Sequence, residues 1–113
     1  MAVVVHNKKI VLNQEGTDFI LVTVNFDEET KQVIAFSVAQ FFKENDRMHE
    51  IIRYDTAHGT LHAHLYYNLK IKKKIFPELL IESKSYYFCR KDIKENWQKY
   101  KILYIRNHLK QRV

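Results

Sequence analysis

The chain is 113 residues long and 46% hydrophobic, which suffices for the core of one domain, residues 1–113, and leaves no room for a second. A single cysteine excludes an intramolecular disulfide and a cysteine-based zinc site, and it fits a reducing, cytoplasmic compartment. We expect neither a signal peptide nor a membrane span, because residues 1–12 are interrupted by polar side chains and no run of about 18 apolar residues exists.

The net charge of +6 is unevenly distributed. Residues 56–113 carry 13 basic and 4 acidic side chains, whereas residues 1–55 carry 6 and 9. A positive second half attracts polyanions, so nucleic acid is the leading partner class, ahead of an anionic membrane surface or an acidic protein.

The first half of the chain predicts a series of β-strands. Residues 3–12 contain two short apolar runs and indicate either an edge strand or an N-terminal arm. Residues 19–26 and 32–42 predict two strands joined by an acidic turn, although the small side chains of the second segment also suit a helix. Residues 48–55 predict the next strand, and the close spacing of all these segments favours an antiparallel meander.

Residues 53–67 hold three of the six histidines in the segment RYDTAHGTLHAHLYY. Polar and apolar residues alternate from Leu61 to Leu69, which predicts a strand with His62 and His64 on the same face. Residues 56–59 form a plausible four-residue hairpin loop in which Gly59 supplies a positive φ.

This loop length sets the expected register of the hairpin. With Asp55 opposite Thr60, Arg53 faces His62 and Ile51 faces His64. One face of this strand pair forms the expected working surface, which consists of Arg53, Asp55, His62 and His64. His49 is expected at the margin of this surface.

The C-terminal part predicts one helix. Asp92 and Glu95 have the spacing of a capping box, and apolar residues recur at helical spacing from Ile93 to about Leu109. The apolar segments 79–81 and 86–89 suit either a last strand or the entry to this helix. The expected fold is therefore α+β, an antiparallel β-meander of four to six strands with a C-terminal helix packed on one face.

The histidine surface predicts proton-transfer chemistry. Histidine both takes and gives a proton near neutral pH, and arginine holds phosphate with two hydrogen bonds. In metal-free RNA cleavage, His62 and His64 would act as general base and acid in either order, and Arg53 or a nearby lysine would stabilise charge on the phosphorus-bound oxygens. Asp55 and His58 lie close by in the sequence. This reaction needs no cofactor and leaves a 2′,3′-cyclic phosphate.

The same residue types also suit a divalent metal such as zinc or manganese. Two histidines separated by one residue on a strand can converge on one ion, with a carboxylate or a third histidine and water completing the coordination. The candidate ligands are Asp55, His58, His62 and His64.

The segment after the histidine strand is rich in lysine. Lys70, Lys72, Lys73 and Lys74 either guide an RNA backbone into the site or protect an edge strand from pairing with another sheet. Tyr66 can stack on a base or donate a hydrogen bond.

The motif Tyr54-Asp55-Thr56, Gly59, His62-Ala63-His64 resembles the Tyr-Asp-Asn, Gly, His-x-His signature of the small TumE-like toxins of prokaryotic toxin–antitoxin pairs. Thr56 replaces the asparagine of that signature, and His58 is an additional histidine. The resemblance implies a compact toxin that acts on RNA and is neutralised by a cognate antitoxin protein. Asp55, Gly59, His62 and His64 are the positions that it carries over.

Two function classes follow from these patterns. The first is a toxin-type ribonuclease, a basic cytoplasmic hydrolase with RNA as its substrate. The second is a non-catalytic nucleic-acid-binding or protein-interaction module of a prokaryotic defence or regulatory system. An exposed sheet edge also allows a homodimer.

Overall fold

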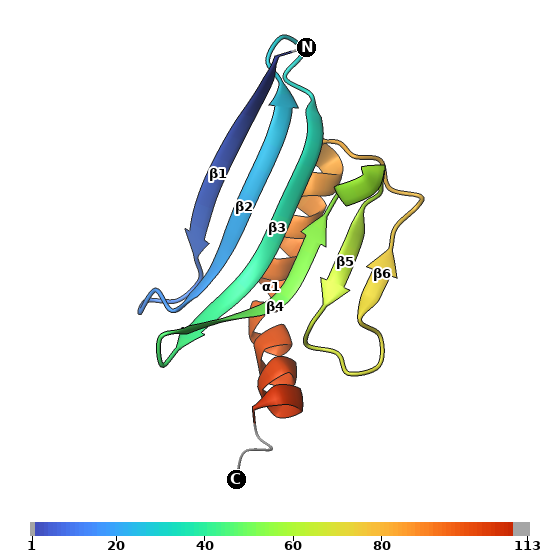
Figure 1. Ribbon diagram of the computed structural model, residues 1–113. Helices are drawn as coiled ribbons and strands as arrows, with labels where there is room; N and C mark the ends of the chain where they lie inside the picture. Colours follow the sequence, from blue (N-terminus) through green and yellow to red (C-terminus); the bar gives the residue numbers. More distant parts are fainter. Residues whose placement is uncertain (1, 110–113) are drawn as a thin grey trace.

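The computed structural model describes residues 2–109, which form a six-stranded antiparallel sheet and one α-helix (Figure 1). Each strand pairs with the next one along the chain, so the sheet is a simple meander. The strands are Val3–Val11 (β1), Asp18–Asp27 (β2), Val33–Glu44 (β3), Arg47–Asp55 (β4), His62–Leu65 (β5) and Lys73–Ile75 (β6). The helix α1, Ser83–His108, packs against β3 and β4, which confirms the expected α+β meander with a C-terminal helix.

The hydrophobic core lies between α1 and one face of the sheet. Ile20, Val38 and Ile52 from three adjacent strands are fully buried, as are Cys89 and Ile93 of the helix. Figure 1 shows α1 behind the sheet, and the sheet face turned away from it is called the open face below. The helix in the described part of the chain has no apolar stretch long enough to cross a membrane.

Two open alternatives are settled in favour of strands. Residues 3–11 form an edge strand, and residues 33–44 form β3. The strand expected over residues 61–69 is shorter, because β5 ends at Leu65. The three-residue edge strand β6 falls within the lysine-rich segment, where the sequence suggests either an edge strand or a guide for an RNA backbone.

The predicted helix start at Ile93 is wrong, because α1 begins at Ser83. Tyr86, Cys89 and Ile93 are buried at helical spacing, so the apolar stripe extends into the segment that also suited a strand. Asp92 therefore lies inside the helix instead of capping it. Its carboxylate accepts hydrogen bonds from the hydroxyl groups of Tyr54 and Tyr100.

The predicted register of the β4–β5 hairpin is also wrong, by two residues. Asp55 pairs with His62 and Arg53 with His64. Six residues, 56–61, separate the paired positions, in place of the expected four. An even shift keeps every side chain on its expected face, so the histidine surface survives with different neighbours.

Candidate active site

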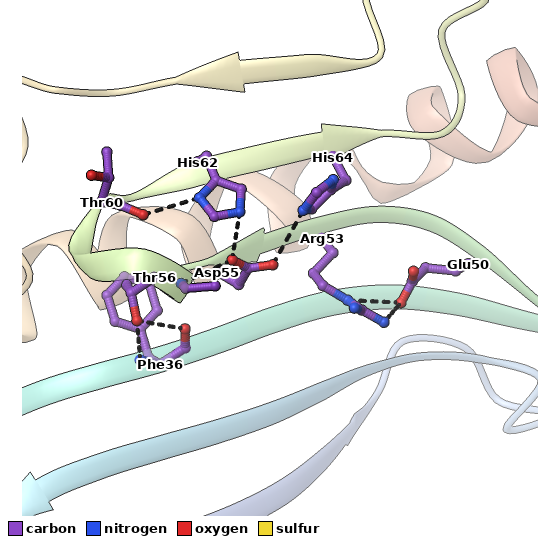
Figure 2. Close-up of polar contacts among 9 residues, drawn as sticks. Phe36, Glu50, Arg53, Asp55, Thr56, Thr60, His62 and His64 are labelled. Carbon is purple, nitrogen blue, oxygen red and sulfur yellow. Dashed lines mark hydrogen bonds and ion pairs between the residues drawn. The ribbon is translucent and has the colours of Figure 1, made fainter.

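Asp55 joins two histidines on the open face of the sheet. Its Oδ1 lies 2.7 Å from Nε2 of His62, and its Oδ2 lies 3.3 Å from Nε2 of His64 (Figure 2). The two imidazole rings are nearly perpendicular, with centroids 4.9 Å apart. These three residues, called the Asp–His cluster below, include the cross-strand pair Asp55 and His62.

His62 is the buried member of the cluster. The residue is 5% exposed, and its Nδ1 lies 3.0 Å from the backbone oxygen of Thr60. A carbonyl oxygen only accepts, so Nδ1 carries a proton and donates it. Nε2 faces the Asp55 carboxylate, 2.7 Å from Oδ1. Both ring nitrogens of His62 are thus engaged within the protein, which limits its direct contact with a substrate.

His64 is the accessible member of the cluster. Its side chain is 29% exposed and borders a pocket of about 480 Å³. Tyr66 stacks on it, with ring centroids 5.9 Å apart and an interplanar angle of 10°. Because Nε2 faces Asp55, the Nδ1 side of the ring remains for a ligand, and the carboxylate orients the imidazole for proton transfer.

The hairpin loop fixes Asp55 in place. The hydroxyl of buried Thr56 accepts a 3.0 Å hydrogen bond from the backbone N–H of Phe36 and lies 3.3 Å from its carbonyl oxygen. The N–H of Ala57 donates to Oδ1 of Asp55 at 3.1 Å. The loop then turns through positive φ at His58 and Gly59. His58 is exposed at this turn and does not join the converging set of donor atoms among the described residues.

Arg53 points away from the histidines. Its Nε and one terminal nitrogen contact Oε2 of Glu50 at 3.1 and 2.5 Å (Figure 2). A β-bulge in β4 allows this contact. Ile52 pairs with Gln40 of β3 and Glu50 pairs with Phe41, so Ile51 has no partner on β3. Glu50 therefore lies on the same face of the sheet as Arg53.

The bulge changes which face the residues before it occupy. Strict alternation places Glu50 beneath the helix and His49 on the open face. In the structure Glu50 meets Arg53, while His49 stacks on Phe42 and lies 3.2 Å from the Tyr104 hydroxyl of α1. The expected place of His49 at the margin of the histidine surface is therefore wrong. Glu50 is a site residue that period-two reasoning could not find.

The four lysines do not act as one cluster. Lys73 pairs with His64 across the β5–β6 ladder, and Lys72 and Lys73 line the pocket beside His64. Lys74 pairs with Ala63 on the helix-facing side, with its ammonium group 5.1 Å from the Phe76 ring centre. Lys70 is exposed in the turn between the strands. Two lysines are thus placed to contact a ligand of His64.

The Asp–His cluster also has the donor set of a metal site. One ligand atom from each of its three residues lies within 4.8 Å of the others. The hydrogen bond from His62 Nδ1 to a backbone carbonyl is the outer contact that orients metal-binding histidines in proteins. Two imidazoles and a carboxylate fit zinc or manganese and leave coordination positions for water.

A family model matches residues 8–110, which include all six of the described strands in part or whole and the helix. The chain belongs to this family, a domain of unknown function (DUF7718). The Asp–His cluster and the pocket beside it lie within the matched residues. No curated protein and no solved structure matches the chain significantly.

Proposed function

We propose that this protein is a ribonuclease that cleaves RNA phosphodiesters at the Asp–His cluster. The observation that carries the proposal is the position of His64, which is oriented by Asp55 and borders a pocket that Lys72 and Lys73 line. This arrangement combines a proton-transfer group with cations that can hold a phosphate.

In the proposed reaction, His64 takes the proton of a ribose 2′-OH through Nδ1, and the 2′ oxygen attacks phosphorus. The 5′ oxygen leaves and takes a proton from a water molecule in the open pocket, and the resulting hydroxide takes the proton that His64 gained. The products are a 2′,3′-cyclic phosphate and a 5′-hydroxyl end, and His64 returns to its neutral form. The two lysines neutralise charge on the phosphorus-bound oxygens. His62 holds Asp55, and it protonates the leaving oxygen directly only if its contact with Asp55 opens.

A metal-dependent form of the reaction is a second candidate. It is favoured by the convergence of the two Nε2 atoms on Asp55 and by the Thr60 contact of His62. In this form the three residues would hold the ion, which would supply Lewis-acid stabilisation of the phosphate.

The resemblance to TumE-like toxins extends the proposal to a cytoplasmic toxin with a cognate antitoxin. The basic second half of the chain supports RNA as the partner. The exposed edge strands β1 and β6 support a homodimer as a further hypothesis, because unpaired strand edges can pair with a second copy.

The experiment that tests this function is incubation of the purified protein with total RNA and tRNA, with and without EDTA. We expect cleavage by the wild-type protein that is lost in His64→Ala and Asp55→Asn and retained in the matched control His6→Ala, which changes a histidine on β1. A 2′-deoxy substitution at the cleaved position blocks the reaction, because the attacking group is removed.

Each arm separates two hypotheses. Cleavage that survives EDTA supports acid–base catalysis by histidine, and EDTA-sensitive cleavage restored by zinc or manganese supports the metal form. Absence of cleavage under every condition, with salt-sensitive RNA binding retained, overturns the enzyme and leaves a nucleic-acid-binding module.

A further inference from the structure

A carboxylate lines one side of the pocket beside His64. A surface that bound RNA only through its phosphates would need cations there and no carboxylate. The carboxylate belongs to Glu50, whose side chain is 19% exposed. The Ile51 bulge brings it onto the face of Arg53 and His64. A carboxylate in a pocket proposed to bind a polyanion needs an explanation in terms of the ligand.

Glu50 is held firmly by its neighbours. Both contacts from Arg53 fall on Oε2, which leaves acceptor capacity on Oε1. Partial burial, followed by the negative charge of Glu50 and a hydrogen bond to it, raises the pKa of Tyr66. A carboxylate only accepts, so the Tyr66 hydroxyl is the donor in its hydrogen bond to Glu50, and the lone pairs of its oxygen remain to accept. This side of the pocket offers two adjacent acceptors.

The remainder of the pocket suits a nucleotide. Its volume of about 480 Å³ is in the range of small-ligand sites. The ring of Tyr66, 38% exposed, offers a face for base stacking. Tyr104 also lines the pocket and is held by its ring contacts with Phe42 and His49. Lys72 and Lys73 supply cations for a phosphate at the same pocket.

We propose that this pocket binds the guanine base of the nucleotide adjacent to the cleaved phosphate, with Glu50 and Tyr66 accepting hydrogen bonds from its Watson–Crick edge. Guanine presents two neighbouring donors there, N1–H and the N2 amino group. Adenine and cytosine each place a ring acceptor beside their amino donor, and uracil has one N–H between two carbonyl acceptors. An acceptor-only wall therefore favours guanine and leaves unpaired or repelling acceptors with the other three bases. The inference rests on the ribonuclease proposed above and names the base that its substrate carries.

Binding of nucleoside 3′-monophosphates tests the pocket without requiring cleavage, since these ligands lack a phosphodiester to break. Isothermal titration of the wild-type protein with the guanosine, adenosine, cytidine and uridine compounds is expected to give at least about tenfold tighter binding of the guanosine compound, a difference of about 1.4 kcal/mol. Glu50→Gln is expected to remove this preference. Glu28→Gln, at an exposed glutamate in the β2–β3 turn, is expected to retain it.

Tyr66→Phe refines the test, because it keeps the ring for stacking and removes the second acceptor. We expect reduced guanosine preference with little change in uridine affinity. Thermal unfolding of each variant shows whether the fold is retained, and the Tyr66→Phe comparison still decides if Glu50→Gln does not fold. Equal affinity for the four nucleotides overturns the inference whether or not RNA is cleaved. Guanosine preference without any RNA cleavage supports the pocket and overturns the ribonuclease.

Discussion

The Tyr54 hydroxyl donates a 2.7 Å hydrogen bond to Oδ2 of Asp92, which connects β4 to the middle of α1. Tyr100 donates to both oxygens of the same carboxylate at 2.9 Å, and Asn96 donates to Oδ1 at 3.0 Å. The residue after Tyr54 in the chain is Asp55, which faces the histidines. Adjacent residues of one strand thus fix the helix on one side of the sheet and orient the candidate active site on the other.

Tyr54→Phe is expected to lower the free energy of unfolding by about 1–3 kcal/mol, because it removes one of the hydrogen-bond donors of the partly buried Asp92 carboxylate. Urea denaturation measures the change. Tyr87→Phe, at an exposed position of the same helix, serves as the control and should change stability by less than about 0.5 kcal/mol. Equal effects of the two substitutions would contradict a special contribution of the Tyr54–Asp92 contact.

Alkaline pH should weaken the same contacts. Burial, and then the hydrogen bond to Asp92 and its charge, raise the pKa of Tyr54 and of Tyr100 above the ordinary value of 10. The folded state holds these protons more tightly than the unfolded chain, so the stabilisation is complete below pH 10 and is lost as the pH rises above it. We expect the urea midpoint to fall above about pH 10, and to fall less steeply in Tyr54→Phe. A midpoint independent of pH in this range would contradict the assignment.

Cys89 should be unreactive in the folded protein. The residue is fully buried against the core, and burial, followed by the charge of Asp92, raises the pKa of its thiol to about 12. Because the thiolate is the reactive form, a disulfide reagent at pH 8 is expected to modify Cys89 at the rate of local or global unfolding. Denaturant should restore ordinary reactivity. Rapid labelling of the native protein would show that the helix does not cover this residue as described.

Lys73 and Lys74 provide a matched pair for RNA binding, because neighbouring residues of β6 point to opposite faces. Lys73→Gln is expected to weaken RNA binding and to reduce the slope of log affinity against log salt by about 0.7–1. Lys74→Gln should leave both quantities nearly unchanged. Fluorescence anisotropy with a labelled oligoribonucleotide at several salt concentrations measures them. Equal losses in the two variants would favour a diffuse cationic surface over contact at the His64 pocket.

The sequence predicts most of what local periodicity controls. Alternation along residues 61–65 places His62 and His64 on one face, and an even error in register leaves that placement intact. Tertiary packing decides what periodicity cannot. The buried Thr56 side chain bonds to β3 and lengthens the loop, and burial of Tyr86 and Cys89 against the sheet starts the helix before Asp92.

The partners of the charged site residues are harder to predict. Arg53 was expected to hold phosphate and instead contacts Glu50. The responsible feature is the bulge at Ile51, which contains no glycine. Its trace in the sequence is the adjacent apolar pair Ile51-Ile52, which interrupts the alternation but does not by itself show which neighbours change face. Convergence of Asp55 with both histidines likewise depends on the two-residue register shift.

The bulge also limits how β4 can change during evolution. Because Ile51 is the extra residue of the bulge, its deletion would join Glu50 directly to Ile52 in a regular strand and would leave Glu50 on the open face and His49 beneath the helix. By contrast, insertion of one residue between Ile51 and Asp55 would turn every residue between the insertion and the bulge to the opposite face of the sheet. Chains that keep this site can therefore lose the bulged residue itself, whereas a single residue gained or lost elsewhere in β4 would turn its neighbours to the opposite face.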